Sequence, residues 1–158
     1  MKGPSYRVFF GTLLVSVFLA INITQLFAGF GQAFPQSPLS LLLTMPLIGV
    51  AVVLATLPIY RYRKAVENYT DGPRPARPNP FYALRVLLLS RATALAGMVF
   101  VGWHLGALLW LTVFSVAPQG PVQLTSLGIL SSLVTLAGGL VGQQFCRAPK
   151  GGSGDEAA

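Results

Sequence analysis

The stretch RVLLLSRATALAGMVFVGWHLG, residues 85–106, is almost wholly apolar, yet it holds two arginines near its start and a histidine near its end. The composition of the whole chain shows which surroundings suit such a run. Of its 158 residues, 53% are hydrophobic and 9% are charged, and the mean hydropathy is +0.65. Soluble domains carry about 25% charged residues. The chain could not cover a globule with a wetted surface, so we expect a membrane protein.

Four apolar segments are long enough to cross a bilayer, which takes about 20 apolar residues per helix. They are residues 8–30, 41–60, 92–116 and 124–145. We therefore predict an all-α integral membrane protein with four transmembrane helices arranged as two hairpins. They would form a single domain over residues 1–146, followed by a flexible tail at 147–158.

The net charge of +7 is distributed unevenly along the chain. The basic residues precede the first segment, lie between the second segment and the start of the third, or follow the fourth: Lys2, Arg7, Arg61, Arg63, Lys64, Arg74, Arg77, Arg85, Arg91, Arg147 and Lys150. The connections after the first and third segments carry no charge. By the positive-inside rule, both termini and the loop 61–79 are predicted to be cytoplasmic. This distribution favours anionic lipid headgroups over nucleic acid as the partner of the basic residues.

The third segment is preceded by a helix-start signal, Asn79 as a cap and Pro80 at the first helical position. A helix from Pro80 to Val116 would be roughly 55 Å long at ~1.5 Å per residue, whereas the hydrocarbon core is about 30 Å thick. We therefore assign residues 80–91 to an interfacial or cytoplasmic extension at the start of the third helix. Arg85 and Arg91 would extend to the headgroups there, and Arg61, Arg63 and Lys64 would anchor the end of the second helix.

Three polar side chains fall within the apolar segments. His104 lies about 20 Å along the helix from Arg91, at a depth where ionisable groups are rare and usually face protein or water. We interpret it as a neutral histidine that bonds across a helix interface, because the segments contain no acidic residue to exchange a proton with it. A proton relay or a ligand contact is the alternative. Asn22 and Gln25 share one face of the first helix and are expected to bond to a neighbouring helix, with a ligand contact as the alternative.

Small residues recur on one face of the fourth segment, at Gly128, Ser131, Thr135, Gly138 and Gly142. The third segment contributes Gly102 and Gly106, with Gly97 nearby. In lipid, small residues let helix backbones approach closely. This pattern predicts either packing within the bundle or docking to another membrane protein. Pro46 and Pro58 predict a kink and a loosened end in the second helix.

The inventory of reactive side chains does not favour an enzyme. The four acidic residues lie outside the apolar segments, and the sequence has no Ser-His-Asp set, phosphate loop or metal-ligand cluster. One histidine and the distant Cys146 could not complete a metal site, and no cofactor is expected. Cys146 is interpreted as a small apolar residue at the membrane interface. The favoured hypothesis is a non-catalytic accessory subunit that contacts other transmembrane proteins or itself, and the alternative is a small oligomeric transporter or channel lined by Asn22, Gln25 and His104.

The chain also resembles an actinobacterial family of small four-span membrane proteins catalogued as a domain of unknown function. The matching stretches are IYRYRKAVENYTDG at 59–72, NPFYALRVLLLSRATALAGMVFVGWHLG at 79–106 and QQFCRAP at 143–149. Positions typical of the family are Arg85, Arg91, Ala94, Gly97, Gly102, Trp103 and Gly106. The resemblance implies a bacterial plasma membrane and genes that often lie beside folate-biosynthesis genes. It implies no reaction and no catalytic residue.

The topology is testable by cysteine labelling in a Cys146→Ser background. A cysteine introduced at Thr70, in the loop predicted to be cytoplasmic, should resist an impermeant thiol reagent added outside intact cells. A cysteine placed in the uncharged connection 31–40 should react. Efficient labelling at position 70 from outside would overturn the predicted orientation.

Overall fold

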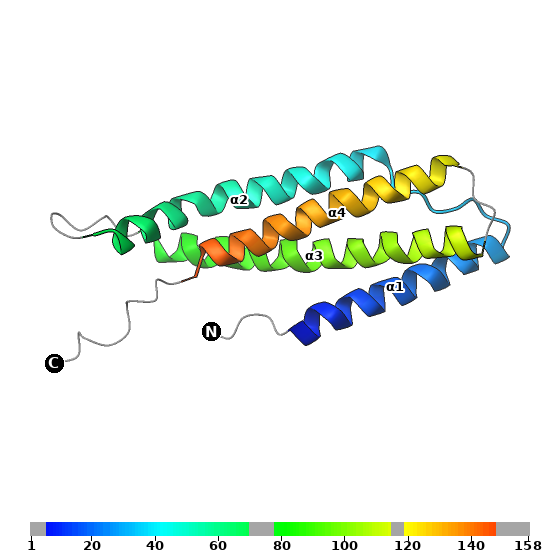
Figure 1. Cartoon of the computed structure of the whole chain (residues 1–158), viewed down its shortest axis with the longest axis horizontal. Coiled ribbons are helices and arrows are strands. Elements are labelled where there is room, and N and C mark those ends of the chain that lie inside the picture. Colours follow the sequence, from blue (N-terminus) through cyan, green and yellow to red (C-terminus); the bar gives the residue numbers. More distant parts are fainter. Residues whose placement is uncertain (1–5, 70–77, 115–118, 148–158) are drawn as a thin grey trace.

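A computed structural model describes residues 6–69, 78–114 and 119–147, and these residues form four α-helices and no strand (Figure 1). The helices are α1 (Tyr6–Gly29), α2 (Leu39–Glu67), α3 (Pro80–Val113) and α4 (Gln119–Phe145). All four are long and apolar enough to cross a membrane. The predicted class, an all-α multi-pass membrane protein, is confirmed.

One helix boundary differs from the sequence prediction, and another agrees with it. α2 continues through Glu67, so residues 61–67 are helical and not part of a loop; residues 70–77 and 148–158 lie outside the described part of the chain. α3 begins as predicted, because the side chain of Asn79 accepts a hydrogen bond from the amide of Phe81 at 2.9 Å. Residues 80–91 follow the same axis as the rest of α3 and form an extension at the start of that helix.

The helices alternate in direction, and α4 lies between α2 and α3 (Figure 1). α1 packs against α3 alone among the helices, and does not contact α2 or α4. The chain therefore reverses as two hairpins predict, but only the second hairpin has its own two helices in contact, because α1 and α2 do not touch each other. The α1–α2 strap, residues 30–38, carries the chain past α3 to reach α2. We call the end of the bundle that bears the strap the loop end, and the end where α1 begins and α4 finishes the basic end.

The contact between α4 and α2 is a close approach of two backbones. A Cβ atom at Gly138 would lie 2.5 Å from the carbonyl oxygen of Gly49, and one at Gly49 would lie 3.0 Å from Cα of Thr135. Such distances leave no room for a side chain. Gly49 was not among the residues that the sequence pattern selected, because it stands alone in its helix at the required spacing.

A hydrogen bond from Ser131 reinforces this contact. Pro46 lacks an amide hydrogen, so the carbonyl of Leu42 four residues earlier has no helical donor. The Ser131 hydroxyl lies 3.0 Å from that oxygen and also 3.2 Å from the carbonyl of Leu127 in its own helix. Polar groups from neighbouring helices commonly satisfy carbonyls freed by proline in membranes. α2 remains one helix through both prolines, so the prediction of a loosened end after Pro58 is wrong.

A neighbouring face of α4, about 100° around the helix axis from Gly138, packs against α3. Gly139 faces the backbone of Ala94, and a Cβ atom at Gly97 would lie 2.6 Å from the amide nitrogen of Leu136. Gly142 lies beside Ser90, whose hydroxyl would be 2.6 Å from an added Cβ. All five residues of the predicted stripe are buried within the chain. The stripe is therefore unavailable as a docking surface for another protein.

α1 packs against the two remaining glycines of α3, Gly102 and Gly106. A Cβ atom at Gly102 would lie 2.7 Å from Cβ of Ser16, and one at Gly106 would lie 2.6 Å from the carbonyl oxygen of Val17. The Ser16 hydroxyl donates to the carbonyl of Val99 across the same contact. α3 thus uses separate sets of glycines for α4 and α1.

We expect Gly138→Ala to destabilise the fold, because the new methyl group would collide with the backbone of Gly49. Overpacking of this kind typically costs about 1–3 kcal/mol. Gly120→Ala is a matched control in the same helix, since an added Cβ there meets nothing within 4 Å. Thermal unfolding in mild detergent measures both variants. Equal stability of the two variants would show that the α2–α4 contact is looser than described.

Candidate functional site

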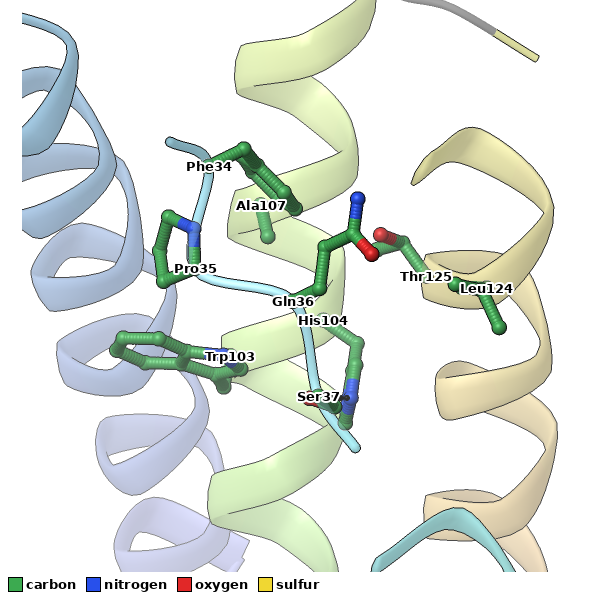
Figure 2. Close-up of a pocket in the computed structure, with 9 residues that line it drawn as sticks. All are labelled: Phe34, Pro35, Gln36, Ser37, Trp103, His104, Ala107, Leu124 and Thr125. Carbon is green, nitrogen blue, oxygen red and sulfur yellow. Dashed lines mark hydrogen bonds between the residues drawn. The ribbon is translucent and has the colours of Figure 1, made fainter. Parts of the chain in front are cut away.

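His104 forms the centre of a polar cluster at the loop end. It projects from α3 toward α4 and lies beneath the α1–α2 strap, with 3% of its surface exposed (Figure 2). Val113, where α3 ends, is nine residues further on, so His104 lies about 14 Å from that end of the helix. Its depth is set by α3, and its shielding is provided by the strap.

The hydrogen bonds of His104 define the state of its ring. Nδ1 lies 2.8 Å from the carbonyl oxygen of Phe100, and Nε2 lies 3.1 Å from the Ser37 hydroxyl. Because a carbonyl oxygen only accepts, Nδ1 carries a hydrogen, and Nε2 of the neutral imidazole accepts from Ser37. The hydrogen bond with Ser37 ties the strap to α3. This arrangement agrees with the interpretation of His104 as a hydrogen-bonding residue between segments.

Two residues of α4 make room for the imidazole. The ring packs directly against Gly128, where any side chain would occupy the position of the ring. The Ser132 hydroxyl donates to the carbonyl of Gly128 at 2.7 Å and lies 3.3 Å from Nδ1 of His104. The predicted stripe included Gly128 because glycine is small. The spacing of the stripe could not show that the His104 ring of α3 packs against this glycine.

A small cavity lies beside His104. Its volume is about 10 Å³, close to the space of a single water molecule. Residues from the strap, α3 and α4 enclose it (Figure 2): Phe34, Pro35, Gln36, Ser37, Trp103, His104, Ala107, Leu124 and Thr125. The cavity can hold a bridging water.

The three intramembrane polar residues do not line one path. Gln25 accepts a hydrogen bond from Nε1 of Trp110 at 2.7 Å, so it joins α1 to α3 as the sequence predicted. Asn22 is exposed on α1, and its amide donates to the carbonyl of Phe18 in the same helix. His104 points toward α4, and α4 does not contact α1. Within one chain, the structure therefore does not bring Asn22, Gln25 and His104 together along a common route.

Arg63 has a structural role at the basic end. One of its terminal nitrogens donates to the carbonyl of Gln144 at 3.1 Å, in the last turn of α4. The guanidinium also lies 5.6 Å from the ring centroid of Tyr60 and within 3.5 Å of Glu67. Cations stabilise the carbonyl end of a helix because the helix dipole is negative there. Arg63 therefore links α2 to the end of α4, a role that the headgroup-anchor prediction missed.

The other predicted anchors are placed differently from Arg63. Arg61, Lys64 and Arg85 are exposed, and Arg91 is partly exposed.

At the same end, Tyr60 and Phe145 stack with ring centroids 4.4 Å apart. Burial raises the pKa of the neighbouring Cys146 thiol, which favours the protonated and less reactive form at neutral pH.

Several residues of these contacts escaped the sequence analysis. Ser37 lies in a connection with no pattern that singles it out, and Ser132 lies one position off the stripe. The pair Gly138 and Gly139 did carry a signal, because adjacent glycines face different neighbours when a helix lies between two others. Reading both faces of the fourth segment would have identified Gly139.

Comparison with known proteins places these contacts within a family. A family model described as "Protein of unknown function (DUF3180)" matches residues 10–150. The chain belongs to this family. No curated protein and no solved structure matches it. The DUF3180 match extends from α1 past the end of α4, so all the helix contacts described above lie within the family domain.

The bond between His104 and Ser37 can be measured by a double-mutant cycle. Ser37→Ala should lower the free energy of unfolding by about 0.5–1.5 kcal/mol, because the strap loses its hydrogen bond to α3. In a His104→Leu background the same change should have little effect, with a coupling near the membrane average of about 0.6 kcal/mol. Denaturant unfolding in detergent provides the four values. Strictly additive effects would show that the two side chains do not interact.

Proposed function

We propose that this DUF3180 protein is a non-catalytic membrane subunit that acts by binding another transmembrane segment. The observation that carries the proposal is the contrast between a closed interior and an unused helix face. Among the described residues, the glycine contacts and buried hydroxyls serve packing inside the chain, and the cavity beside His104 holds at most about one water. The outer surface of the helix bundle is therefore the part that is available to bind another protein.

The unused face belongs to α1, which is the least buried of the four helices. The outward face of α1 consists of Gly11, Val15, Phe18, Asn22 and Gly29, about half a turn from the residues that pack on α3. Val15 and Phe18 are 60% and 66% exposed. Lipid can cover apolar side chains, but the amide of Asn22 favours a partner that can form hydrogen bonds. The outward face of α1 is therefore the proposed binding surface.

The proposal includes a location and an orientation. The concentration of basic residues at one end supports a plasma-membrane protein with that end in the cytoplasm. The exposed Arg61, Lys64 and Arg85 would contact anionic headgroups there. Arg63 would contribute less, because it is already bonded to α4.

Site-specific photocrosslinking in intact membranes tests the binding surface. A benzophenone amino acid at Phe18 should form an adduct whose cross-linked peptide belongs to a transmembrane segment. The control is the same probe at Leu43, which is 60% exposed on α2. Adducts with lipid alone at both positions, or equal protein adducts at both, would contradict a specific role for α1.

A further inference from the structure

The polar group on the outward face of α1 has hydrogen-bonding capacity that the chain itself does not use. Asn22 donates one amide hydrogen to the carbonyl of Phe18 at 2.8 Å. Within the described residues its side chain makes no other hydrogen bond, which leaves the second hydrogen and the amide oxygen free. Asn22 lies about 10 Å along the helix from Gly29, where α1 ends, and about 22 Å from Arg7. Its depth is therefore within the membrane-crossing part of α1.

Two glycines lie on the same line of α1 as Asn22. Gly11 and Gly29 are 18 residues apart, which is about five full turns, and an added Cβ at either would meet nothing within 4 Å. By contrast, the glycines that pack α2, α3 and α4 together each have a neighbouring atom at 3.0 Å or less. The outward face of α1 thus offers two places where another helix could approach closely, with an unsatisfied amide between them.

The spacing of these residues follows a heptad. Val15, Asn22 and Gly29 are seven residues apart, and Phe18 lies between the first two at the complementary position. The next complementary position is Gln25, whose side-chain oxygen is already bonded to Trp110 of α3. Such a seam fits one partner helix, and a single asparagine within it fixes the register and the number of helices. The pattern therefore favours one crossing partner over a diffuse contact with lipid.

We propose that the partner on the outward face of α1 is α1 of a second copy of this chain, paired around Asn22 in a parallel, two-fold symmetric dimer. An amide is self-complementary, because its free N–H can donate to the free oxygen of an identical amide. Copies that insert with the same orientation place Asn22 at the same depth, and a two-fold axis brings the same patch of each copy together. This inference rests on the proposed function, because it names the occupant of the proposed binding surface.

Disulfide crosslinking in native membranes tests the dimer. In a Cys146→Ser background, Val15→Cys lies on the predicted axis one heptad before Asn22, and oxidation should yield a species of twice the chain mass. Leu14→Cys is the matched control, since Leu14 is adjacent, 52% exposed and rotated by about 100° from Val15. Selective crosslinking at position 15 is the expected result. Equal crosslinking at both positions, or none at position 15, would overturn the proposal.

The role of Asn22 is tested in the Val15→Cys background. Asn22→Leu should weaken dimerisation by about threefold to 20-fold, the range that corresponds to measured interhelical hydrogen bonds in membranes. Asn22→Gln should retain most of the crosslink. The side-chain hydrogen bond of Asn22 stays within α1, so neither Asn22→Leu nor Asn22→Gln should change the unfolding temperature of the monomer. Crosslinking unaffected by Asn22→Leu would overturn the pairing around this residue.

The two proposals fail in distinguishable ways. A Phe18 adduct to a different membrane protein, without a disulfide at position 15, would overturn the dimer and leave the subunit function standing. Adducts of Phe18 to this same chain together with the position-15 disulfide would support both. Lipid adducts alone, without the disulfide, would overturn both.

Discussion

The close approach of α4 to two helices at once is the constraint on which the rest of the structure depends. In a bilayer the lipid tails are as apolar as the side chains, so helix association relies on tight packing and polar contacts. Gly138 meets Gly49 of α2, and Gly139 meets Ala94 of α3. Because α4 covers one face of α3, α1 packs on a different face of α3, the one that carries Gly102 and Gly106.

Polar groups inside the bundle serve this packing. Ser131 satisfies the carbonyl that Pro46 leaves without a donor, and His104 ties the strap to α3 while its ring packs against Gly128. In hydrocarbon each unsatisfied backbone group costs several kcal/mol, so these bonds matter more than their number suggests. They give these intramembrane polar residues a structural use within the bundle. Asn22 differs from Ser131 and His104, because its side chain is exposed on the outward face of α1.

The fold was largely predictable because bilayer thickness and loop charge constrain a membrane chain strongly. Four apolar runs gave four helices, and Asn79 with Pro80 marked the start of α3 correctly. The end of α2 was not predictable from charge, because Arg61 and Lys64 suggested headgroups, whereas the helix continues to Glu67 with Arg63 bonded to α4. Of the candidate site, the sequence identified His104, Gly128 and Gln25 but not their partners. Ser37 is 67 residues away along the chain from its partner His104, and Trp110 is 85 residues away from its partner Gln25.

The sequence by itself determined that the chain crosses a membrane four times and which residues are small or polar within the crossings. Hydropathy and side-chain size are properties of each residue and its near neighbours, so they can be read along the chain. Only the tertiary structure decided that α1 packs on α3 and not on α2, that the small-residue stripe is internal, and that His104 and Asn22 face different surroundings. Those outcomes depend on which helix faces fit together, and a fit between two surfaces is not encoded in the spacing of either one.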